Sequence, residues 1–279
     1  MTILVTGSSG RVGAALVPLL HGAGHDVRAA SRRPERLSPV PGVEVVACDL
    51  GDPGTFAAAL DGVDSVFLYA EPAHIGEFVR QARTAGVTHI VLLSSSSVVL
   101  PRADDNPIAV AHLDVERALT ASPVEATFLR PDAFATNAYQ WAGAVRTTGA
   151  VDLPYPRAYT SPIHEADIAD AAFAALTEAR HRGGAFLLTG PESLTFADQI
   201  AVLAEITGRE IAVNARTPEA WREATSAFMP PPVAKALLQY WAAQDGVRSE
   251  VTDAIQHLTG HPARTFTTWA RDHAAAFAD

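Results

Sequence analysis

Thr2-Ile3-Leu4-Val5-Thr6-Gly7-Ser8-Ser9-Gly10-Arg11-Val12-Gly13-Ala14-Ala15-Leu16 decides the fold of this 279-residue chain. A short run of β-branched and apolar residues stops at a glycine turn. A helical pattern of apolar residues begins directly after the turn. This order predicts a strand, a tight turn and a helix at the start of an α/β domain.

The three glycines of this stretch are three residues apart. Gly7 can adopt the backbone angles of a tight turn, Gly10 lets a pyrophosphate approach the backbone, and Gly13 lets the helix pack closely on the strand. The free N–H groups of the helix then face the phosphates. The alternative is an ordinary glycine-rich turn, but the strand–turn–helix context favours a nucleotide site. We expect cofactor contacts from Gly7, Ser9, Gly10, Arg11, Val12 and Gly13.

The bulk composition fits one large domain, or one domain with a smaller appendage, because 48% of the residues are hydrophobic and 19% are charged. No apolar run approaches the length of a membrane-spanning helix, which is about 20 residues. The N-terminus leads directly into a strand, so we expect no export. The single cysteine, Cys48, excludes an internal disulfide and fits a reducing cytoplasm.

The formal net charge is −10, from 31 acidic and 21 basic side chains. A surface that binds nucleic acid needs the opposite balance. We therefore expect a small-molecule partner, no nucleic acid and no membrane, and we leave a homodimer open.

The loop after the second expected strand, residues 26–30, carries Ser31-Arg32-Arg33. Dinucleotide-binding folds hold the adenosine ribose at this point, and an acidic residue there binds the 2′-hydroxyl of NAD. Guanidinium groups suit a 2′-phosphate instead. We therefore expect NADP(H), with Arg32 as the favoured contact and Arg33 as its alternate. The other interpretation is a solvated basic loop.

Further apolar runs at 43–47, 65–69, 89–93 and 126–130 alternate with helical patterns. This alternation predicts a parallel, doubly wound sheet, that is, an α/β Rossmann fold. After Pro131 the pattern becomes less regular. We expect residues 1–150 to form the NAD(P)-binding domain, and residues 151–279 to complete the sheet and form a small C-terminal α/β substrate subdomain.

In order along the chain, the motifs resemble the NmrA-like branch of the atypical short-chain dehydrogenase/reductases. The matching motifs are Thr6-Gly7-x-x-Gly10-x-x-Gly13, the arginines after the second strand, Leu129-Arg130-Pro131, Asp167-Ile168-Ala169, Leu188-Thr189-Gly190-Pro191 and Gly260-His261-Pro262-Ala263-Arg264-Thr265-Phe266.

This resemblance implies a Rossmann domain with a small substrate subdomain and a preference for NADP(H). It also implies cofactor contacts at Asp49 and Leu50 on the adenine side, and at Leu68, Tyr69, Ala70, Ser94 and Ser95 near the nicotinamide. The family includes quinone and azo-dye reductases as well as proteins that bind the dinucleotide as redox sensors.

The catalytic Tyr-x-x-x-Lys pair of typical short-chain dehydrogenases is absent from this sequence. Lys235 is the only lysine, and Pro231 stands four residues before it. In the helix before Leu129, His112 and Glu116 are four residues apart and share one helical face. We expect His112 as proton donor, with Glu116 orienting it or binding a ribose hydroxyl. The alternative is a solvent-facing pair without a function.

Reduction of a quinone, unlike that of a ketone, does not need a proton donor from the protein, because water can protonate the stabilised hydroquinone anion. Four residues are therefore candidates for the substrate pocket, although core packing explains Trp141 equally well: Tyr69, Asn137, Tyr139 and Trp141.

We expect an NADPH-dependent oxidoreductase that acts on a small conjugated acceptor such as a quinone. Two alternatives remain: an NADP(H) sensor that acts through a protein partner, and a secondary-metabolism reductase of a polycyclic intermediate. A metal site is not expected, because the histidines lack ligand spacing such as H-E-x-x-H. Ser94 to Ser97 also lack the G-x-S-x-G motif of a serine hydrolase.

Overall fold

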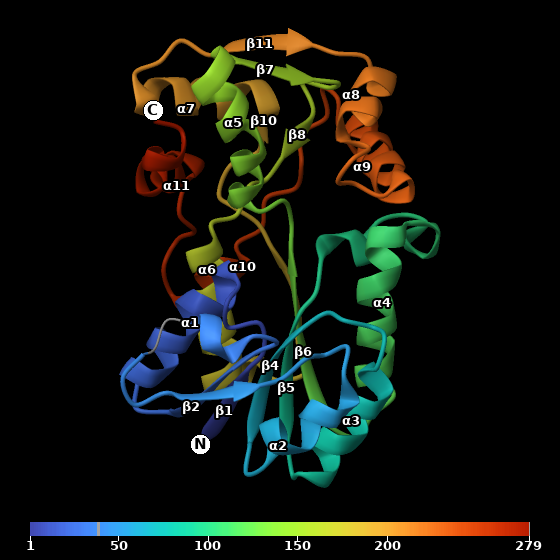
Figure 1. The fold of residues 1–279 in the computed structure, drawn as a ribbon, viewed down its shortest axis with the longest axis vertical. Coiled ribbons are helices and arrows are strands. Elements are labelled where there is room, and N and C mark those ends of the chain that lie inside the picture. The colour runs from blue at the N-terminus through green and yellow to red at the C-terminus, as the bar shows by residue number, and fades with distance from the viewer. Residues whose placement is uncertain (38–39, 279) are drawn as a thin grey trace.

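A parallel sheet forms the centre of the molecule in the computed structural model, which describes residues 1–37 and 40–278. Within these residues the sheet has seven strands in the order β3-β2-β1-β4-β5-β6-β9 (Figure 1). Its strands are β1 (Thr2–Val5), β2 (Asp26–Ser31), β3 (Glu44–Ala47), β4 (Ser65–Tyr69), β5 (His89–Leu93), β6 (Glu125–Pro131) and β9 (Ala185–Leu188). The predicted doubly wound sheet is confirmed, and its second to sixth strands match the predicted ranges to within one residue at each end.

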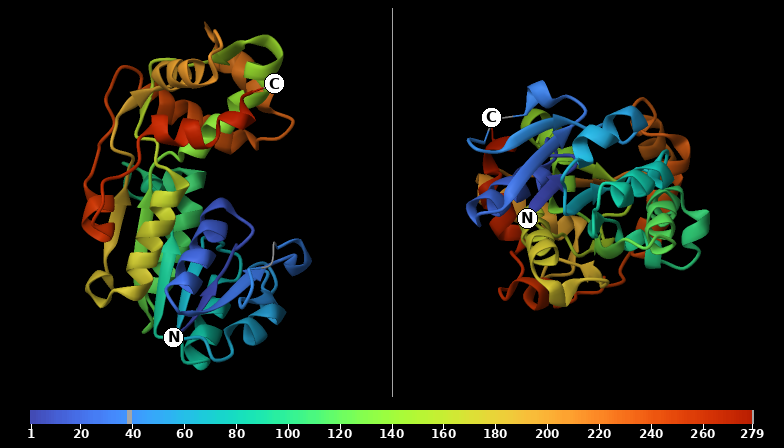
Figure 2. Two further views of the ribbon diagram at one scale, coloured as in Figure 1. Left: turned by 90° about the vertical axis from the view of Figure 1, so that its left-hand side faces the viewer. Right: turned by 90° about the horizontal axis from the view of Figure 1, so that it is seen from below.

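Helices cover both faces of the sheet (Figure 2). One apolar cluster joins the sheet to α1 (Arg11–Gly22), α6 (Glu165–Thr177) and α10 (Ala254–Thr259). A second cluster joins the other face to α2 (Phe56–Leu60), α3 (Ile75–Thr84) and α4 (Pro107–Thr120). Side chains of one strand alternate between the clusters, because Ile3 and Val5 lie in the first and Leu4 in the second. Burial on both faces explains the continuous apolar run of β5.

The second half of the chain builds a smaller unit at the opposite end from the N-terminus (Figure 1). Its apolar cluster includes Trp141, Phe196 and Trp269. Two small sheets pair β7 with β11 and β8 with β10. The elements are a 3₁₀ turn (Ala135–Ala138), α5 (Tyr139–Thr148), β7 (Ala150–Leu153), β8 (Tyr159–Thr160), β10 (Leu194–Thr195), α7 (Phe196–Thr207), β11 (Ala212–Ala215), α8 (Pro218–Thr225), α9 (Pro231–Ala243) and α11 (Phe266–Asp272). We call this unit the subdomain.

The chain passes between the two units several times, so they form one body. After β7 it returns to the main sheet through α6 and β9. Helix α9 of the subdomain also packs against α4 of the main unit (Figure 1). These contacts place the carboxyl ends of β4, β5 and β6 below the subdomain.

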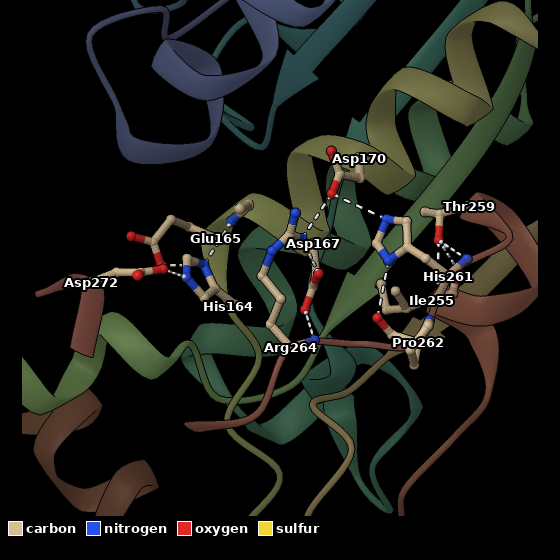
Figure 3. A network of polar contacts seen from close by, with 11 residues as sticks. His164, Glu165, Asp167, Asp170, Ile255, Thr259, His261, Pro262, Arg264 and Asp272 are labelled. Atoms are coloured by element: carbon tan, nitrogen blue, oxygen red, sulfur yellow. Dashed lines mark hydrogen bonds and ion pairs between the residues drawn. The ribbon is translucent and has the colours of Figure 1, made fainter. Parts of the chain in front are cut away.

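A buried ion pair fixes the C-terminal segment on α6 (Figure 3). The guanidinium of Arg264 pairs with the carboxylates of Asp167 and Asp170, and the Arg264 backbone N–H donates to Asp167 Oδ2 at 2.7 Å. The Asp167 side chain is fully buried, so removal of Arg264 would leave its carboxylate without a compensating charge. His261 adds a contact of 3.3 Å to Asp170. The segment that leads into α11 is thereby held against the main unit.

None of the helices in residues 1–37 and 40–278 has the length and apolar character needed to cross a bilayer.

Candidate active site

The turn between β1 and α1 has the geometry that its glycines predict. Gly7 has φ of +61°, in the left-handed region that favours glycine. A Cβ on Gly13 would lie 2.5 Å from the Gly7 carbonyl oxygen, so a larger residue cannot stand there without moving the turn. Gly10 is the N-cap of α1 and has no side chain to cover the free N–H groups of the first turn. A dinucleotide phosphate fits such a helix start.

Tyr69, at the end of β4, lies over this turn. A Cβ on Gly7 would meet the Tyr69 ring at 2.6 Å, and a Cβ on Gly10 would meet its hydroxyl at 2.9 Å. Burial raises the pKa of Tyr69, while the backbone N–H groups of Gly13 and Val12 act in the opposite direction by bonding its hydroxyl. Tyr69 therefore reaches the phosphate end of the site as well as the nicotinamide end to which the family resemblance assigns it.

The basic loop follows β2, as the sequence predicts. Arg32 and Arg33 are exposed, and neither guanidinium has a partner among the residues that the structure describes. Asp49 and Leu50 follow the neighbouring strand β3, and Asp49 accepts a hydrogen bond of 2.9 Å from the Gly51 N–H. In parallel sheets of this kind the carboxyl ends of the strands bind the ligand. The two arginines are thus free to hold a phosphate group there.

A cavity of about 580 Å³ lies at the carboxyl ends of β4, β5 and β6 and extends under the subdomain. Seven of the predicted site residues line it: Tyr69, Ala70, Ser94, Ser95, His112, Asn137 and Trp141. The wall contributed by the subdomain includes Leu237, Tyr240 and Trp241 of α9. None of the described residues in its lining is an arginine or a lysine. The cavity therefore suits an uncharged, largely apolar molecule.

Leu68 contributes no side chain to this cavity. It is 1% exposed and belongs to the apolar cluster on the α2, α3 and α4 face. The side chains of β4 alternate between the two faces of the sheet, which explains why Leu68 differs from its neighbour Tyr69. Only the backbone of Leu68 remains as a cofactor contact.

Glu116 differs from the prediction in its partners. Its carboxylate accepts two hydrogen bonds from Arg130, at 3.0 and 2.6 Å, and one from Ser94 Oγ at 2.6 Å. This bidentate pair uses both carboxylate oxygens. Glu116 therefore holds Ser94 and Arg130 at the ends of β5 and β6, and no hydrogen bond joins it to His112 among the described contacts. The prediction that Glu116 orients His112 is corrected accordingly.

His112 lines the cavity, and its Nδ1 is buried without a hydrogen-bond partner among the described residues. Burial lowers the pKa of His112, and the charge of Glu116 opposes the shift. The ring is thus mostly neutral near pH 7. A neutral imidazole can donate a hydrogen bond to an acceptor, but it is a weaker proton donor than the predicted imidazolium.

Tyr139 does not line the cavity, contrary to the prediction. Its hydroxyl lies 2.7 Å from His273 Nδ1, and its ring stacks on Phe277. The guanidinium of Arg11 lies 4.2 Å from the centre of the Tyr139 ring. The first turn of α5 points this side chain toward α1 and α11, whereas Trp141 faces the cavity.

Asp132 is a cavity residue that the sequence analysis did not single out. It follows β6 directly, and its Oδ1 accepts hydrogen bonds from Ser96 Oγ at 3.2 Å and from the Tyr240 hydroxyl at 3.4 Å. The Ser161 N–H donates to Oδ2 at 3.1 Å. Its position directly after Leu129-Arg130-Pro131, at the carboxyl end of a parallel strand, is the sequence feature that could have identified it as a site residue.

A second cluster joins α6 to α11 beside the turn. His164, Glu165 and His273 bring potential metal-ligand atoms within 4.8 Å of one another. His164 Nδ1 accepts the N–H of Ala166 and so caps the start of α6, and His164 Nε2 lies 3.3 Å from Asp272 (Figure 3). Glu165 lies 2.9 Å from His273. Three of the four ring nitrogens have hydrogen-bond partners, whereas His273 Nε2 and Glu165 Oε2 are buried without one among the described residues.

Comparison with known proteins gives one family. The model of a family described as NAD(P)H-binding matches residues 7–179. A (4-alkanoyl-5-oxo-2,5-dihydrofuran-3-yl)methyl phosphate reductase of Streptomyces griseus is 40% identical, over 99% of both chains. An NAD(P)H azoreductase of Xenophilus azovorans is 34% identical, again over 99% of both.

Solved structures share the fold. An NADPH-dependent quinone oxidoreductase of Escherichia coli, solved with NADPH, superimposes with a TM-score of 0.83. The match covers 97% of this chain and 99% of that one at 23% identity.

Proposed function

The chain belongs to the NAD(P)H-binding family and is an NAD(P)H-dependent oxidoreductase, and we propose that it transfers hydride from NADPH to a small, uncharged, conjugated acceptor such as a quinone. The observation that carries this proposal is the position of the cavity. It begins beside the glycine turn at Tyr69 and ends at α9, and its described lining has no arginine or lysine.

The cofactor end of the site supports NADPH. The glycine turn offers the N–H groups of α1 to the pyrophosphate, and Arg32 and Arg33 offer charge to a 2′-phosphate. Ala70, Ser94 and Ser95 line the cavity, and we propose that the nicotinamide binds beside them. The nicotinamide supplies the hydride when it is bound. The protein binds and orients the two reactants and excludes water.

The division of labour along the chain follows the two units. We assign cofactor binding to the predicted domain of residues 1–150, except for residues 135–148, which belong to the subdomain. Residues 151–279 complete the sheet and, with residues 135–148, form the roof of the cavity. Tyr240 and Trp241 of α9 belong to this roof, and they are the last residues in the sequence that line the cavity.

The acceptor end supports a planar, uncharged substrate. Trp141, Phe134 and Trp241 provide aromatic surface, and Asn137 provides a hydrogen-bonding group. The Streptomyces relative is named for an acceptor with a phosphate group. A phosphate in this cavity would meet the carboxyl of Asp132 and no guanidinium or ammonium of the described lining. We therefore propose a conjugated carbonyl, quinone or azo compound without a phosphate.

The test is NADPH oxidation against matched acceptors. The panel contains neutral quinones, neutral enones, azo dyes and one enone in two forms, as a free alcohol and as its phosphate ester. We expect turnover on the neutral compounds, and a kcat/KM at least about tenfold lower on the phosphate ester than on the alcohol. Tight NADPH binding without turnover on any acceptor would favour the sensor. Preference for the ester would contradict the inference from the cavity lining.

A further inference from the structure

The cavity contains one carboxyl group, Asp132, among its described lining residues. Its position is fixed from three directions. Ser96 follows β5, Ser161 follows β8, and Tyr240 belongs to α9 of the subdomain. Asp132 is therefore a point at which both units of the molecule hold the same side chain at the wall of the cavity.

The contacts of Asp132 are donors. Hydroxyl groups of Ser96 and Tyr240 reach Oδ1, and a backbone N–H reaches Oδ2. Such donors stabilise the carboxylate after it has lost a proton. No described cationic side chain lines the cavity to keep the group permanently ionised. Asp132 therefore has donors that stabilise its ionised form and no neighbouring cation that holds it ionised, so it can exist in both protonation states.

We propose that Asp132 is the proton donor to the reduced acceptor, and that Tyr240 is the residue that positions it. This proposal rests on the proposed function, because it concerns the second half of the same reaction. It gives the site an acid in place of the missing Tyr-x-x-x-Lys pair.

The proton and electron balance is simple. Hydride arrival leaves the acceptor with two more electrons and one negative charge. The O–H bond of the Asp132 carboxyl then breaks, and a new O–H, N–H or C–H bond forms on the acceptor. The carboxylate keeps the electron pair and later takes a proton from solvent. The sum is NADPH, one proton and the acceptor giving NADP⁺ and the reduced acceptor.

The other titratable groups that face the cavity are less suited to this step. They are Tyr69 from β4, His112 from α4 and Tyr240 from α9. Burial raises the pKa of both tyrosines and lowers that of His112. The Tyr240 hydroxyl already donates to Asp132, and its pKa lies above the usual range. Burial also raises the pKa of Asp132, despite its three hydrogen-bond donors, and so extends its protonated form toward neutral pH.

The experiment compares Asp132→Asn with the wild-type protein on acceptors whose reduced anions differ in basicity. Asparagine keeps the shape of the side chain and can accept the Ser161 N–H. For an enone or an azo dye, whose hydride adduct is a strong base, we expect kcat to fall about 100-fold. For a quinone, whose hydroquinone anion is a weak base, we expect a fall of about twofold or less, because water can protonate it. The Kd of NADPH should not change.

Tyr240→Phe separates positioning from chemistry. Loss of the phenol removes one donor that favours the Asp132 carboxylate, so the pKa of Asp132 should rise. The alkaline limb of the kcat profile on an enone should therefore move to higher pH in Tyr240→Phe and disappear in Asp132→Asn. Asp114→Asn is the matched control, because Asp114 is an exposed carboxylate on α4. It should leave the profile unchanged.

Two results would overturn the proposal. An equal loss on enones and quinones in Asp132→Asn would show a structural effect, and undiminished enone reduction would assign the proton to another donor. Thermal melting of the variant checks that it folds. A wild-type protein that reduces none of the acceptors would overturn the proposed function together with this inference. An active wild type with an unaffected Asp132→Asn variant would overturn the inference alone.

Discussion

The two ends of the site are built in different ways. The phosphate end comes from one short piece of chain, from Gly7 to Arg33, and uses backbone N–H groups and exposed arginines. The acceptor end collects side chains from β4 to α9, between Tyr69 and Trp241. The first end depends on local backbone geometry, and the second depends on how the subdomain packs over the sheet.

The two ends also differ in charge. Arg32 and Arg33 make the first end basic, whereas the described lining of the cavity has one carboxyl group and no arginine or lysine. A molecule with phosphates is therefore favoured at one end and disfavoured at the other. We propose that this difference orients the dinucleotide and leaves the cavity for a neutral acceptor.

Gly13→Val should have the largest effect on this comparison. The new Cβ would lie 2.5 Å from the Gly7 carbonyl oxygen and 2.9 Å from Ser8 Cα, so α1 must move away from β1. We expect NADPH affinity, measured by calorimetry, to fall at least about 100-fold, with a lower melting temperature.

Gly143→Ala is the control for this change. Gly143 is exposed on α5, and an added Cβ there would meet nothing within 4 Å. It should bind NADPH like the wild type. Normal NADPH affinity in Gly13→Val would show that phosphates do not use the turn.

Arg32→Ala with Arg33→Ala should have the next largest effect. Loss of charge-assisted bonds to a 2′-phosphate should raise the Kd of NADPH about 30-fold. The Kd of NADH should change by about twofold or less, because NADH lacks this phosphate. Arg83→Ala, at an exposed site on α3, removes one positive charge outside the loop and should have no effect. An equal loss for both dinucleotides would contradict the assignment.

Sequence reasoning succeeded where the structure is local. The glycine spacing predicts the turn, because the backbone requirement lies in consecutive residues. The strands of the parallel sheet also follow, because the apolar runs of the first 130 residues are its strands. Helices separate them except between β2 and β3, which a 3₁₀ turn (Pro34–Arg36) joins. The ends of α7 are likewise set by local residues, since Thr195 forms a capping box and Gly208 is a left-handed C-cap.

The acceptor end could not be predicted in the same way. Helical spacing places His112 and Glu116 on one face, but Arg130 from β6 takes the carboxylate. Proximity in sequence placed Tyr139 and Trp141 together, but the turn of α5 sends them to different neighbours. Tyr240 reaches Asp132 across 108 residues, and nothing in the local pattern of α9 specifies that contact. Long-range packing decides each of these positions.

Tyr69→Phe should have a small effect of the opposite sign at the phosphate end. The Tyr69 hydroxyl bonds the N–H groups of Val12 and Gly13, to which a phosphate oxygen would bind. Without the hydroxyl these groups are free, so the Kd of NADPH should fall about threefold. Tyr155→Phe, in the subdomain, is the control. Weaker binding in Tyr69→Phe would instead make the phenol a phosphate contact.

His112→Gln should have the smallest effect. Burial lowers the pKa of His112, so the ring is mostly neutral at pH 7 and its loss removes a hydrogen-bonding group rather than an acid. We expect kcat on an enone to fall about threefold, with the alkaline limb of the pH profile in place. A fall of about 100-fold, with loss of that limb, would transfer the proton-donor role from Asp132 to His112. The acceptor end would then use an imidazole from α4, and the contact of the subdomain with Asp132 would be structural.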